Sequence, residues 1–524
     1  MLTPAPAGPA PWGLAEFDAL APLALAQARE WAAEAGQSPA RTPGGVTTGA
    51  PADAPGGADG VPAPRLPVGE GPREPGEVLA DLRALVEGGL NTRSPRYLGY
   101  LPSGGQPVAA LADLLAAAAN PYTGLPSASP GGVAVDEAVV AWLCATVGLP
   151  AGAGGVLTSG GSLATLTGVL LAREVAGIHP AASAGLVTYV GEHRHHSVDA
   201  ALRWAGLAEH PAGARTRVVD SDASHRMDAA ALRRAMDDDV AAGLRPWLVV
   251  ATAGTTSTGA VDPLAAVATH ARAHGAWLHV DAAFGGMYAL AADAPPALAG
   301  LGLADSVTVD PHKGLFLPYG LGALLVRERR HLAAVFALDA GYLPEDGPDT
   351  AAQTAQDTAA HAAPDGRGAP SPVAHLGLEL TRPWRGLRAW LPLQLHGRRA
   401  FAAQVQARLA LARRAHERLS GVPGLRVGPP PELTVVTFHL DDDASTAALL
   451  ARLCDDGRTF LSSTVLGGRL VGRLATGSAR TRRRDVEEVC DALARAAASV
   501  LAPAAVTPTA LTPTAPTPTP VEPS

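Results

Sequence analysis

The middle of the chain alternates short apolar runs with longer Ala-rich segments, and this alternation restricts the fold more than any other feature. Four runs have the length and the continuous apolar character of strands buried on both faces: GLVTYV (185–190), WLVVAT (247–252), WLHVDA (277–282) and SVTVDP (306–311). Helical segments such as 162–176 and 263–274 lie between them. The pattern predicts an α/β domain with a mostly parallel sheet and ligand sites at the strand ends.

Composition divides the rest of the chain into regions. Residues 14–35 predict an amphipathic helix, and helical character returns at 78–87. Between them, residues 38–75 are rich in Pro, Gly and Ala and carry too few large apolar groups to form a packed core. A second weakly hydrophobic stretch, 344–372, interrupts the α/β pattern and is typical of a functional lid.

After residue 385 the pattern predicts a smaller α+β unit. Its expected elements are a long helical stretch (386–420), a β-like run (432–440) and helices over 445–455 and 484–497. We therefore predict an N-terminal helical segment (1–104) with a disordered insertion (38–75), a large domain (105–385) with a mobile loop (339–375), a small C-terminal domain (386–502) and a disordered Thr/Pro-rich tail (503–524).

Charge and cysteine content exclude several classes of function. Acidic residues number 49 and basic residues 41, and the net charge of −8 argues against nucleic acid or an anionic membrane as the main partner. Three widely spaced cysteines fit neither a disulfide framework nor a CxxC metal site. The N-terminus lacks signal-peptide character, and no apolar stretch is long enough to span a bilayer. We expect a cytoplasmic protein that needs no metal.

The strongest chemical signal is the tetrapeptide from Asp310 to Lys313, directly after a predicted buried strand. Lysines are scarce in this chain, whose basic residues are nearly all arginine. A lysine at the end of a buried strand is costly unless it has a function, and a desolvated lysine is nucleophilic toward carbonyl groups. The alternative is a surface lysine that happens to follow a strand.

A second signal is Asp281 in the run HVDAA, an acid at the carboxyl end of an apolar strand. Such a carboxylate requires a cationic partner, and a protonated pyridine nitrogen would serve. A helix N-cap or a metal ligand is the alternative. Ahead of a helix, the run TSGGS (158–162) offers free N–H groups and hydroxyls that suit a phosphate, although Gly-rich turns of this kind are common.

Two further motifs follow predicted strands. The run EHRHHS (192–197) holds three histidines whose ring directions seldom converge on one metal, so a histidine stacked on an aromatic cofactor is the sharper interpretation. The run AGTTSTG (253–259) brings hydroxyls to another strand end and is by itself a plain turn. All five motifs follow strands of one domain, and together they describe a pyridoxal-phosphate site.

At these residues the chain resembles the group II pyridoxal-phosphate-dependent amino-acid decarboxylases, which include aromatic-L-amino-acid, histidine, glutamate and 2,4-diaminobutyrate decarboxylases. The resemblance runs from about residue 94 to residue 497 and rests on the motifs TSGGSLATLTG, EHRHHSV, ATAGTTSTGAVDPL, WLHVDAAFGG and ADSVTVDPHKG. It implies fold type I, with an aspartate-aminotransferase-like large domain and a small C-terminal domain. It also implies a homodimer in which the N-terminal segment packs on the partner subunit.

The resemblance assigns roles to individual residues. Lys313 would form the internal aldimine with the cofactor, and Asp281 would pair with the pyridine nitrogen. His195 would stack on the ring, while Gly161 and Ser162 would bind the phosphate.

Five more residues receive roles in the same way. His312 would help to bind the phosphate, and Thr256 would lie near the ring. Leu101 and Ser103 would lie on the substrate side. Tyr342, on the mobile loop, would reach the neighbouring subunit's site and protonate the substrate carbon after carbon dioxide leaves. A tyrosine here favours simple decarboxylation over aldehyde synthesis.

The leading hypothesis is decarboxylation of an L-amino acid to its amine and carbon dioxide. A second hypothesis keeps the cofactor and changes the reaction to transamination, carbon–sulfur lysis or oxidative decarboxylation, because one fold supports many reactions. A third is a scaffold protein that binds partners through its Pro-rich tail.

Overall fold

The structure is a computed structural model, and it describes residues 14–35, 39–40, 71–87, 89–207, 214–337 and 372–502. Most of the predicted 38–75 insertion, nearly all of the predicted mobile loop with Tyr342, and the tail from 503 lie outside these residues. Within the described ranges, no helix combines the length and the apolar character needed to cross a membrane.

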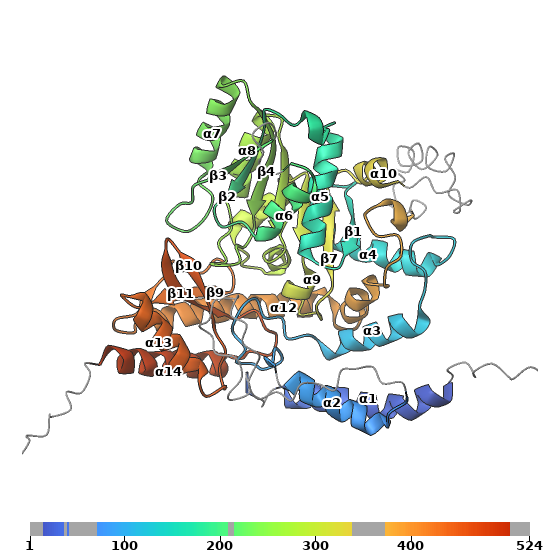
Figure 1. Cartoon of the computed structure of the whole chain (residues 1–524), viewed down its shortest axis with the longest axis vertical. Helices are drawn as coiled ribbons and strands as arrows, with labels where there is room; N and C mark the ends of the chain where they lie inside the picture. Colours follow the sequence, from blue (N-terminus) through green and yellow to red (C-terminus); the bar gives the residue numbers. More distant parts are fainter. Residues whose placement is uncertain are drawn as a thin grey trace, which may run out of the picture.

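A seven-stranded mixed sheet forms the centre of the large domain, in the order β1-β7-β6-β5-β4-β2-β3 (Figure 1). Its strands are β1 (Gly154–Thr158), β2 (Leu186–Gly191), β3 (Arg215–Val219), β4 (Arg245–Thr252), β5 (Trp277–Ala282), β6 (Ser306–Val309) and β7 (Gly322–Val326). β7 runs opposite to the other six strands, which share one direction. The predicted α/β fold with a mostly parallel sheet is confirmed.

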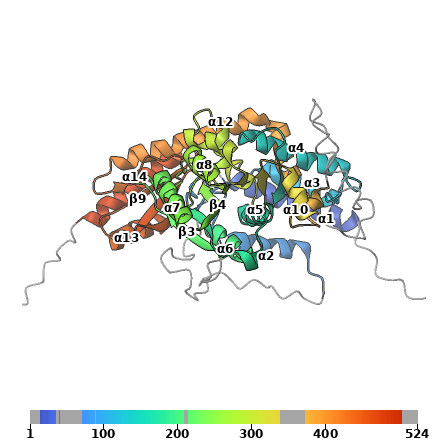
Figure 2. The same cartoon turned by 90° about the horizontal axis from the view of Figure 1, so that it is seen from above.

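Helices cover both faces of this sheet because its inner strands are apolar on both sides. In β4, Val249 and Ala251 pack into one core cluster, whereas Leu248 and Val250 pack into another on the opposite face. Helices that contact the sheet directly are α4 (Pro130–Thr146), α5 (Gly161–Val175), α7 (Ala229–Ala241), α8 (Leu264–Ala273) and the single turn α9 (Pro311–Gly314), and α6 (His196–Trp204) packs on α5 (Figure 2). Helix α10 (Arg330–Phe336) also packs on α5.

A smaller antiparallel sheet follows, in the order β10-β11-β9-β8. Its strands are β8 (Arg426–Val427), β9 (Val435–His439), β10 (Ser462–Leu466) and β11 (Arg469–Ala475), and the helices α13 (Asp443–Cys454) and α14 (Arg483–Leu501) accompany it. The long helix α12 (Gly386–Ser420) joins the two cores, because Phe401 packs in the large one and Leu419 in the small one. The predicted single helix is interrupted at Gly397, whose φ of 75° is not helical.

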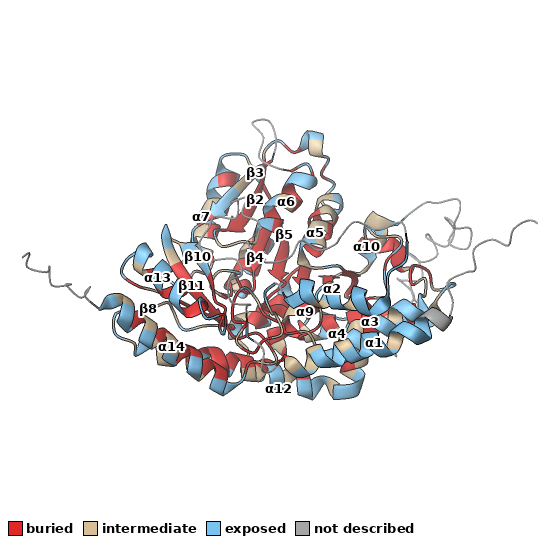
Figure 3. Ribbon diagram, turned by 60° about the horizontal axis from the view of Figure 1, so that its bottom comes forward, coloured by how far each residue is buried: buried red, intermediate tan, exposed pale blue. Residues whose placement is uncertain are grey.

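Helices α1 (Leu14–Glu34) and α2 (Pro75–Glu87) lie together at one side of the molecule, and α3 (Pro107–Ala119) lies between them and the large domain (Figure 1). Arg83 on α2 pairs with Glu30 at 2.8 Å and with Glu34 at 3.3 Å on α1. Helix α2 buries no residue, and much of this side of the molecule is exposed (Figure 3).

The buried ion pair between Asp136 and Arg382 connects α4 to the segment before α12. Asp136 Oδ2 lies 3.0 Å from the Arg382 guanidinium, and Asp136 Oδ1 accepts a hydrogen bond from the Gly386 N–H at 3.0 Å. Replacing Asp136 with Ala would leave the Arg382 charge buried and unpaired. We expect a loss of about 3–5 kcal/mol in the free energy of unfolding, measured by denaturant titration.

Glu137 supplies the matched control for this prediction. It is the next residue on α4 and pairs with Arg329, but both side chains are about a quarter exposed. Glu137→Ala should therefore cost no more than about 1 kcal/mol. Equal losses for the two variants would contradict the importance of the Asp136–Arg382 pair.

Candidate active site

A cavity of about 330 Å³ opens at the carboxyl edge of the large sheet. Seven of the ten predicted site residues line it: Gly161, Ser162, His195, Thr256, Asp281, His312 and Lys313. Leu101 packs instead against the large core, and the Ser103 hydroxyl donates to the Leu317 carbonyl at 3.3 Å. Tyr342 lies outside the described residues. The roles assigned to all ten residues stay predictions.

Strand direction explains why distant motifs meet here. β1 and β6 are each antiparallel to β7, so they run the same way and end at the same edge of the sheet. The strands β2, β4 and β5 are parallel to one another, and β5 is parallel to β6. The segments that follow all five strands therefore converge on one cavity.

Lys313 lies on the single helical turn α9, directly after β6. Counting the whole sequence shows that it is the only lysine of the chain. Its Nζ lies 3.0 Å from Asp310 Oδ2, and the Asp310 side chain is buried. Beside it, His312 Nδ1 contacts the Leu321 carbonyl at 2.7 Å, and because a carbonyl oxygen only accepts, Nδ1 donates.

Asp281 is a buried carboxylate at the end of β5, with 6% of the residue exposed. Its Oδ1 accepts the Ala283 N–H at 3.1 Å. Among the described residues, no cationic side chain forms an ion pair with Asp281 within 4.0 Å. A buried carboxylate without a protein cation fits a cationic ligand, such as a protonated pyridine nitrogen.

His195 caps the N-terminus of α6, and its Nδ1 accepts the Ser197 N–H at 3.2 Å. Burial lowers the pKa of His195, and the nearby charge of Lys313 acts in the same direction. The ring is therefore neutral near pH 7, which suits stacking on an aromatic ring. Among the described residues, no group of His, Cys, Asp and Glu is arranged to hold a metal ion.

The turn before α5 brings the free N–H groups of a helix start to the cavity wall, where they could hold an anion. Gly160 is the N-cap of α5, and Gly161 and Ser162 begin its first turn, where backbone N–H groups are free of helical partners. A Cβ atom on Gly161 would meet Ala283 Cβ and Asp310 Oδ2, both at 3.0 Å. A side chain at this position would fit only if these neighbours moved by a few tenths of an ångström.

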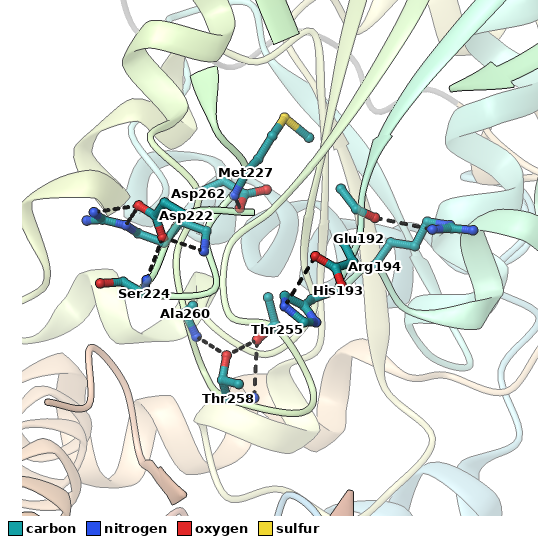
Figure 4. Close-up of polar contacts among 12 residues, drawn as sticks. Glu192, His193, Arg194, Asp222, Ser224, Met227, Thr255, Thr258, Ala260 and Asp262 are labelled. Atoms are coloured by element: carbon teal, nitrogen blue, oxygen red, sulfur yellow. Dashed lines mark hydrogen bonds and ion pairs between the residues drawn. The ribbon is translucent and has the colours of Figure 1, made fainter. Parts of the chain in front are cut away.

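The loop after β4, to which Thr256 belongs, is crossed by hydrogen bonds between Thr255, Thr258 and Ala260 (Figure 4). Thr255 Oγ1 and Thr258 Oγ1 lie 2.6 Å apart, which closes the loop on itself. At its end, the buried carboxylate of Asp262 accepts the N–H groups of Thr252 and Met227, each at 2.7 Å. The position of Thr256 is thereby set by residues on both sides of the loop.

Arg473 on β11 secures this loop from the small domain. Its buried guanidinium donates to the carbonyls of Thr256, Ser257 and Tyr100 and to the Ser462 hydroxyl. These acceptors are all uncharged, and burial lowers the pKa of Arg473 to about 10. The small domain is thus connected directly to the cavity wall and to the turn that holds Leu101 and Ser103.

Nine of the sixteen residues that line the cavity were not among the predicted site residues, and Thr252, Phe284 and Asp310 are three of these nine. Asp310 could have been found, because it is an acid that ends an apolar strand, the same signal that identified Asp281. Thr252 Oγ1 and Asp310 Oδ1 are buried without a hydrogen-bond partner.

The residues present fit pyridoxal phosphate. Around one cavity they place a lysine for the aldehyde, a buried carboxylate for the ring nitrogen and a neutral histidine for the ring face. The free N–H groups at the start of α5 suit the phosphate. A fold of this type with such a site defines a pyridoxal-phosphate enzyme of fold type I.

The family model described as the pyridoxal-dependent decarboxylase conserved domain matches residues 67–441. This is well over half of the chain, and the chain belongs to that family. It is accordingly a pyridoxal-phosphate-dependent carboxy-lyase.

Individual relatives agree with this placement. The chain is 29% identical over 404 residues to an aromatic-L-amino-acid decarboxylase of Bacillus atrophaeus, covering 75% of this chain and 79% of that protein. It is 30% identical over 454 residues to an aromatic-L-amino-acid decarboxylase of Sus scrofa, covering 82% and 88%. The crystal structure of Oryza sativa TDC with PLP and tryptamine superimposes with a TM-score of 0.80 at 25% identity, covering 93% and 99%.

The buried carboxylate of Asp262 predicts a pH-dependent stability. Burial raises its pKa to about 6, above the value of about 3.9 in an unfolded chain. The folded state therefore holds this proton more tightly, and the resulting stabilisation is complete below about pH 4 and lost as the pH rises through the folded pKa.

Asp262→Asn cannot titrate and isolates this effect. Relative to the variant, the free energy of unfolding of the wild type should fall by about 2–3 kcal/mol between about pH 4 and about pH 7. Denaturant titrations of both proteins at several pH values measure it. A wild-type-to-variant difference that is constant with pH would contradict the prediction.

Proposed function

We propose that this protein decarboxylates an L-amino acid to the corresponding amine and carbon dioxide, with Lys313 as the residue that links covalently to the cofactor. The observation that carries the proposal is the convergence of Lys313, Asp281 and His195 on one cavity at the carboxyl edge of the sheet. Lys313 is the only side-chain amine of the chain, so no other side chain can form this link.

When bound, the cofactor supplies an electron sink for the charge left on the substrate carbon once carbon dioxide departs. Asp281 would keep a proton on the ring nitrogen, and that proton would in turn compensate the buried carboxylate. His195, neutral because of burial, would cover one face of the ring. The first turn of α5 would hold the phosphate with backbone N–H groups.

For the substrate we propose an aromatic L-amino acid. Relatives from a bacterium and a mammal carry the name aromatic-L-amino-acid decarboxylase, and the solved relative from Oryza sativa was crystallised with tryptamine. Phe284, a buried aromatic residue, is among those that line the cavity. Leu101 and Ser103 would act on the substrate side, together with Tyr342 from the neighbouring subunit as the proton donor.

We further propose that the chain works in the cytoplasm as a homodimer. Cys144 and Cys490 are free and buried, in keeping with a reducing compartment. Large apolar side chains are exposed on α1 and α3: Phe17, Leu20, Leu23, Leu111, Leu114 and Leu115. A second copy of the chain that covers them would remove this surface from water.

Replacing Lys313 with Ala tests the proposed reaction. The variant should lose the visible absorbance of the lysine-linked cofactor and release no carbon dioxide above background from a panel of L-amino acids. Borohydride reduction of the wild type should add one cofactor to the intact mass, and peptide mapping should place it on Lys313 rather than on the N-terminal amine.

The products distinguish the competing reactions. Amine and carbon dioxide in equal amounts support simple decarboxylation. A keto acid would indicate transamination instead. An aldehyde with ammonia and peroxide would indicate oxidative decarboxylation. Covalent attachment that persists in Lys313→Ala would overturn the assignment of the lysine.

Leu115→Glu tests the dimer. Leu115 is 54% exposed on α3, and a carboxylate buried between two subunits without a partner is strongly unfavourable. The variant should be monomeric in light scattering at concentrations where the wild type is dimeric. Val465→Glu, on β10 and 64% exposed, is the control that should stay dimeric. If Leu115→Glu is still dimeric, the subunit interface does not include Leu115 and lies on another surface.

A further inference from the structure

Asp310 is a cavity residue whose carboxylate is buried and incompletely paired with the described part of the chain. The residue is 3% exposed, and its Oδ1 has no hydrogen-bond partner. Its Oδ2 lies 3.0 Å from Lys313 Nζ and 3.8 Å from His312 Nε2. In this arrangement the lysine ammonium is the principal partner of the carboxylate.

The Asp310 carboxylate is held in place by backbone on two sides. A Cβ atom on Gly161 would approach Oδ2 to 3.0 Å, and one on Gly322 would approach Oδ1 to 2.7 Å. The carboxylate fills the space between the start of α5 and β7. Both carboxylate oxygens are therefore packed against backbone.

We propose that Asp310 is a positioning residue with two successive partners: it holds Lys313 while the site is empty of cofactor, and it pairs with protonated His312 once Lys313 is linked. Cofactor attachment then takes up a proton at His312 Nε2. The proposal rests on the proposed role of Lys313, and neither Asp310 nor this exchange of partners is assigned by the family resemblance.

The covalent step itself leaves the proton count unchanged. The Lys313 ammonium and the aldehyde carbon of pyridoxal phosphate form a carbon–nitrogen double bond. Two protons of the ammonium leave with the aldehyde oxygen as water, and the nitrogen keeps one proton and its positive charge. This single N–H stays with the cofactor, and Asp310 loses the three-proton donor that had faced it.

A buried carboxylate without a donor is costly, and His312 is placed to replace the lysine. Its Nδ1–H is occupied by the Leu321 carbonyl at 2.7 Å, so Nε2 is the nitrogen that lies toward Asp310. Protonation of Nε2 supplies both an N–H and a positive charge. A small rotation of the ring about its contact with Leu321 would close the 3.8 Å gap.

Surrounding charges favour this exchange. Burial lowers the pKa of His312 in the cofactor-free chain, Lys313 and Arg388 lower it further, and Asp310 raises it. When Lys313 moves away from Asp310, its lowering effect on the pKa of His312 becomes weaker. The negative charge of a bound phosphate would raise this pKa further. The titratable and charged groups around this cluster come from several elements: Lys313 on α9, Arg388 on α12, Asp281 on β5, His195 at the start of α6 and Tyr319 before β7.

The experiment compares two ligands on the full chain after its cofactor has been removed. Pyridoxal 5'-phosphate can link to Lys313, whereas 4-deoxypyridoxine 5'-phosphate carries a methyl group in place of the aldehyde and cannot. Titration calorimetry in buffers of different ionisation enthalpy counts the protons taken up on binding. We expect the chain to take up roughly one more proton when it binds the aldehyde than when it binds the methyl compound. The ratio of the two binding affinities should therefore fall about tenfold for each unit by which the pH rises.

Two variants locate the proton. His312→Asn keeps a donor for the Leu321 carbonyl but cannot take up a proton, and Asp310→Asn removes the charge that attracts it. Both should abolish the difference between the two ligands. Asp305→Asn is the matched control, because Asp305 lies at the opposite end of β6, where it accepts the Leu278 N–H at 2.8 Å. It should leave the difference unchanged.

The outcomes separate this proposal from the proposed function. Equal proton uptake with both ligands in the wild type would assign the proton to phosphate binding and overturn the exchange of partners. A difference that survives in His312→Asn would also overturn it. Since Lys313 is the only lysine, a reduced cofactor adduct on it shows that the link itself forms in either case. Failure to trap any adduct would instead overturn the proposed role of Lys313.

Discussion

Asp281 is a buried carboxylate that forms no ion pair with a cationic side chain in the described part of the chain. It lies at the wall of a cavity that could hold a cationic ligand. Such a charge is costly at the end of an inner strand unless hydrogen bonds or an opposite charge compensate it. The parallel strands around β5 end at the same edge, where Lys313, His195 and the start of α5 face the same cavity. A cofactor with a protonated ring nitrogen, an aldehyde and a phosphate satisfies these groups together.

The small domain contributes to this site through rigidity rather than through chemistry. The buried guanidinium of Arg473 connects the loop of Thr256 to the turn that carries Leu101 and Ser103, and all its acceptors are uncharged. Helix α12 joins both cores, so movement of one domain relative to the other would strain packed residues at both of its ends. The walls of the cavity are therefore fixed from two directions.

Much of the α/β core could be predicted because its strands are apolar on both faces, as the runs at β2, β4 and β5 show. Strand β3 escaped prediction because it lies at the sheet edge, where its side chains are mostly exposed and polar. The run SVTVDP was predicted as a strand through residue 311, but β6 ends at Val309 and Asp310 begins the turn of α9. The antiparallel direction of β7 has no local signal, since hydrogen-bond direction depends on the neighbouring strands.

The sequence by itself determined the fold class, the cofactor and the set of groups available for chemistry, because strand ends, glycines and a solitary lysine are local features that periodicity and spacing reveal. Only the tertiary structure decided which of these groups meet. It placed Asp310 against Lys313 and His312, and it brought Arg473 from more than two hundred residues away to the carbonyl of Thr256. Such pairings depend on which strand ends lie together and on which charges burial leaves without water, and no single segment of the sequence contains that information.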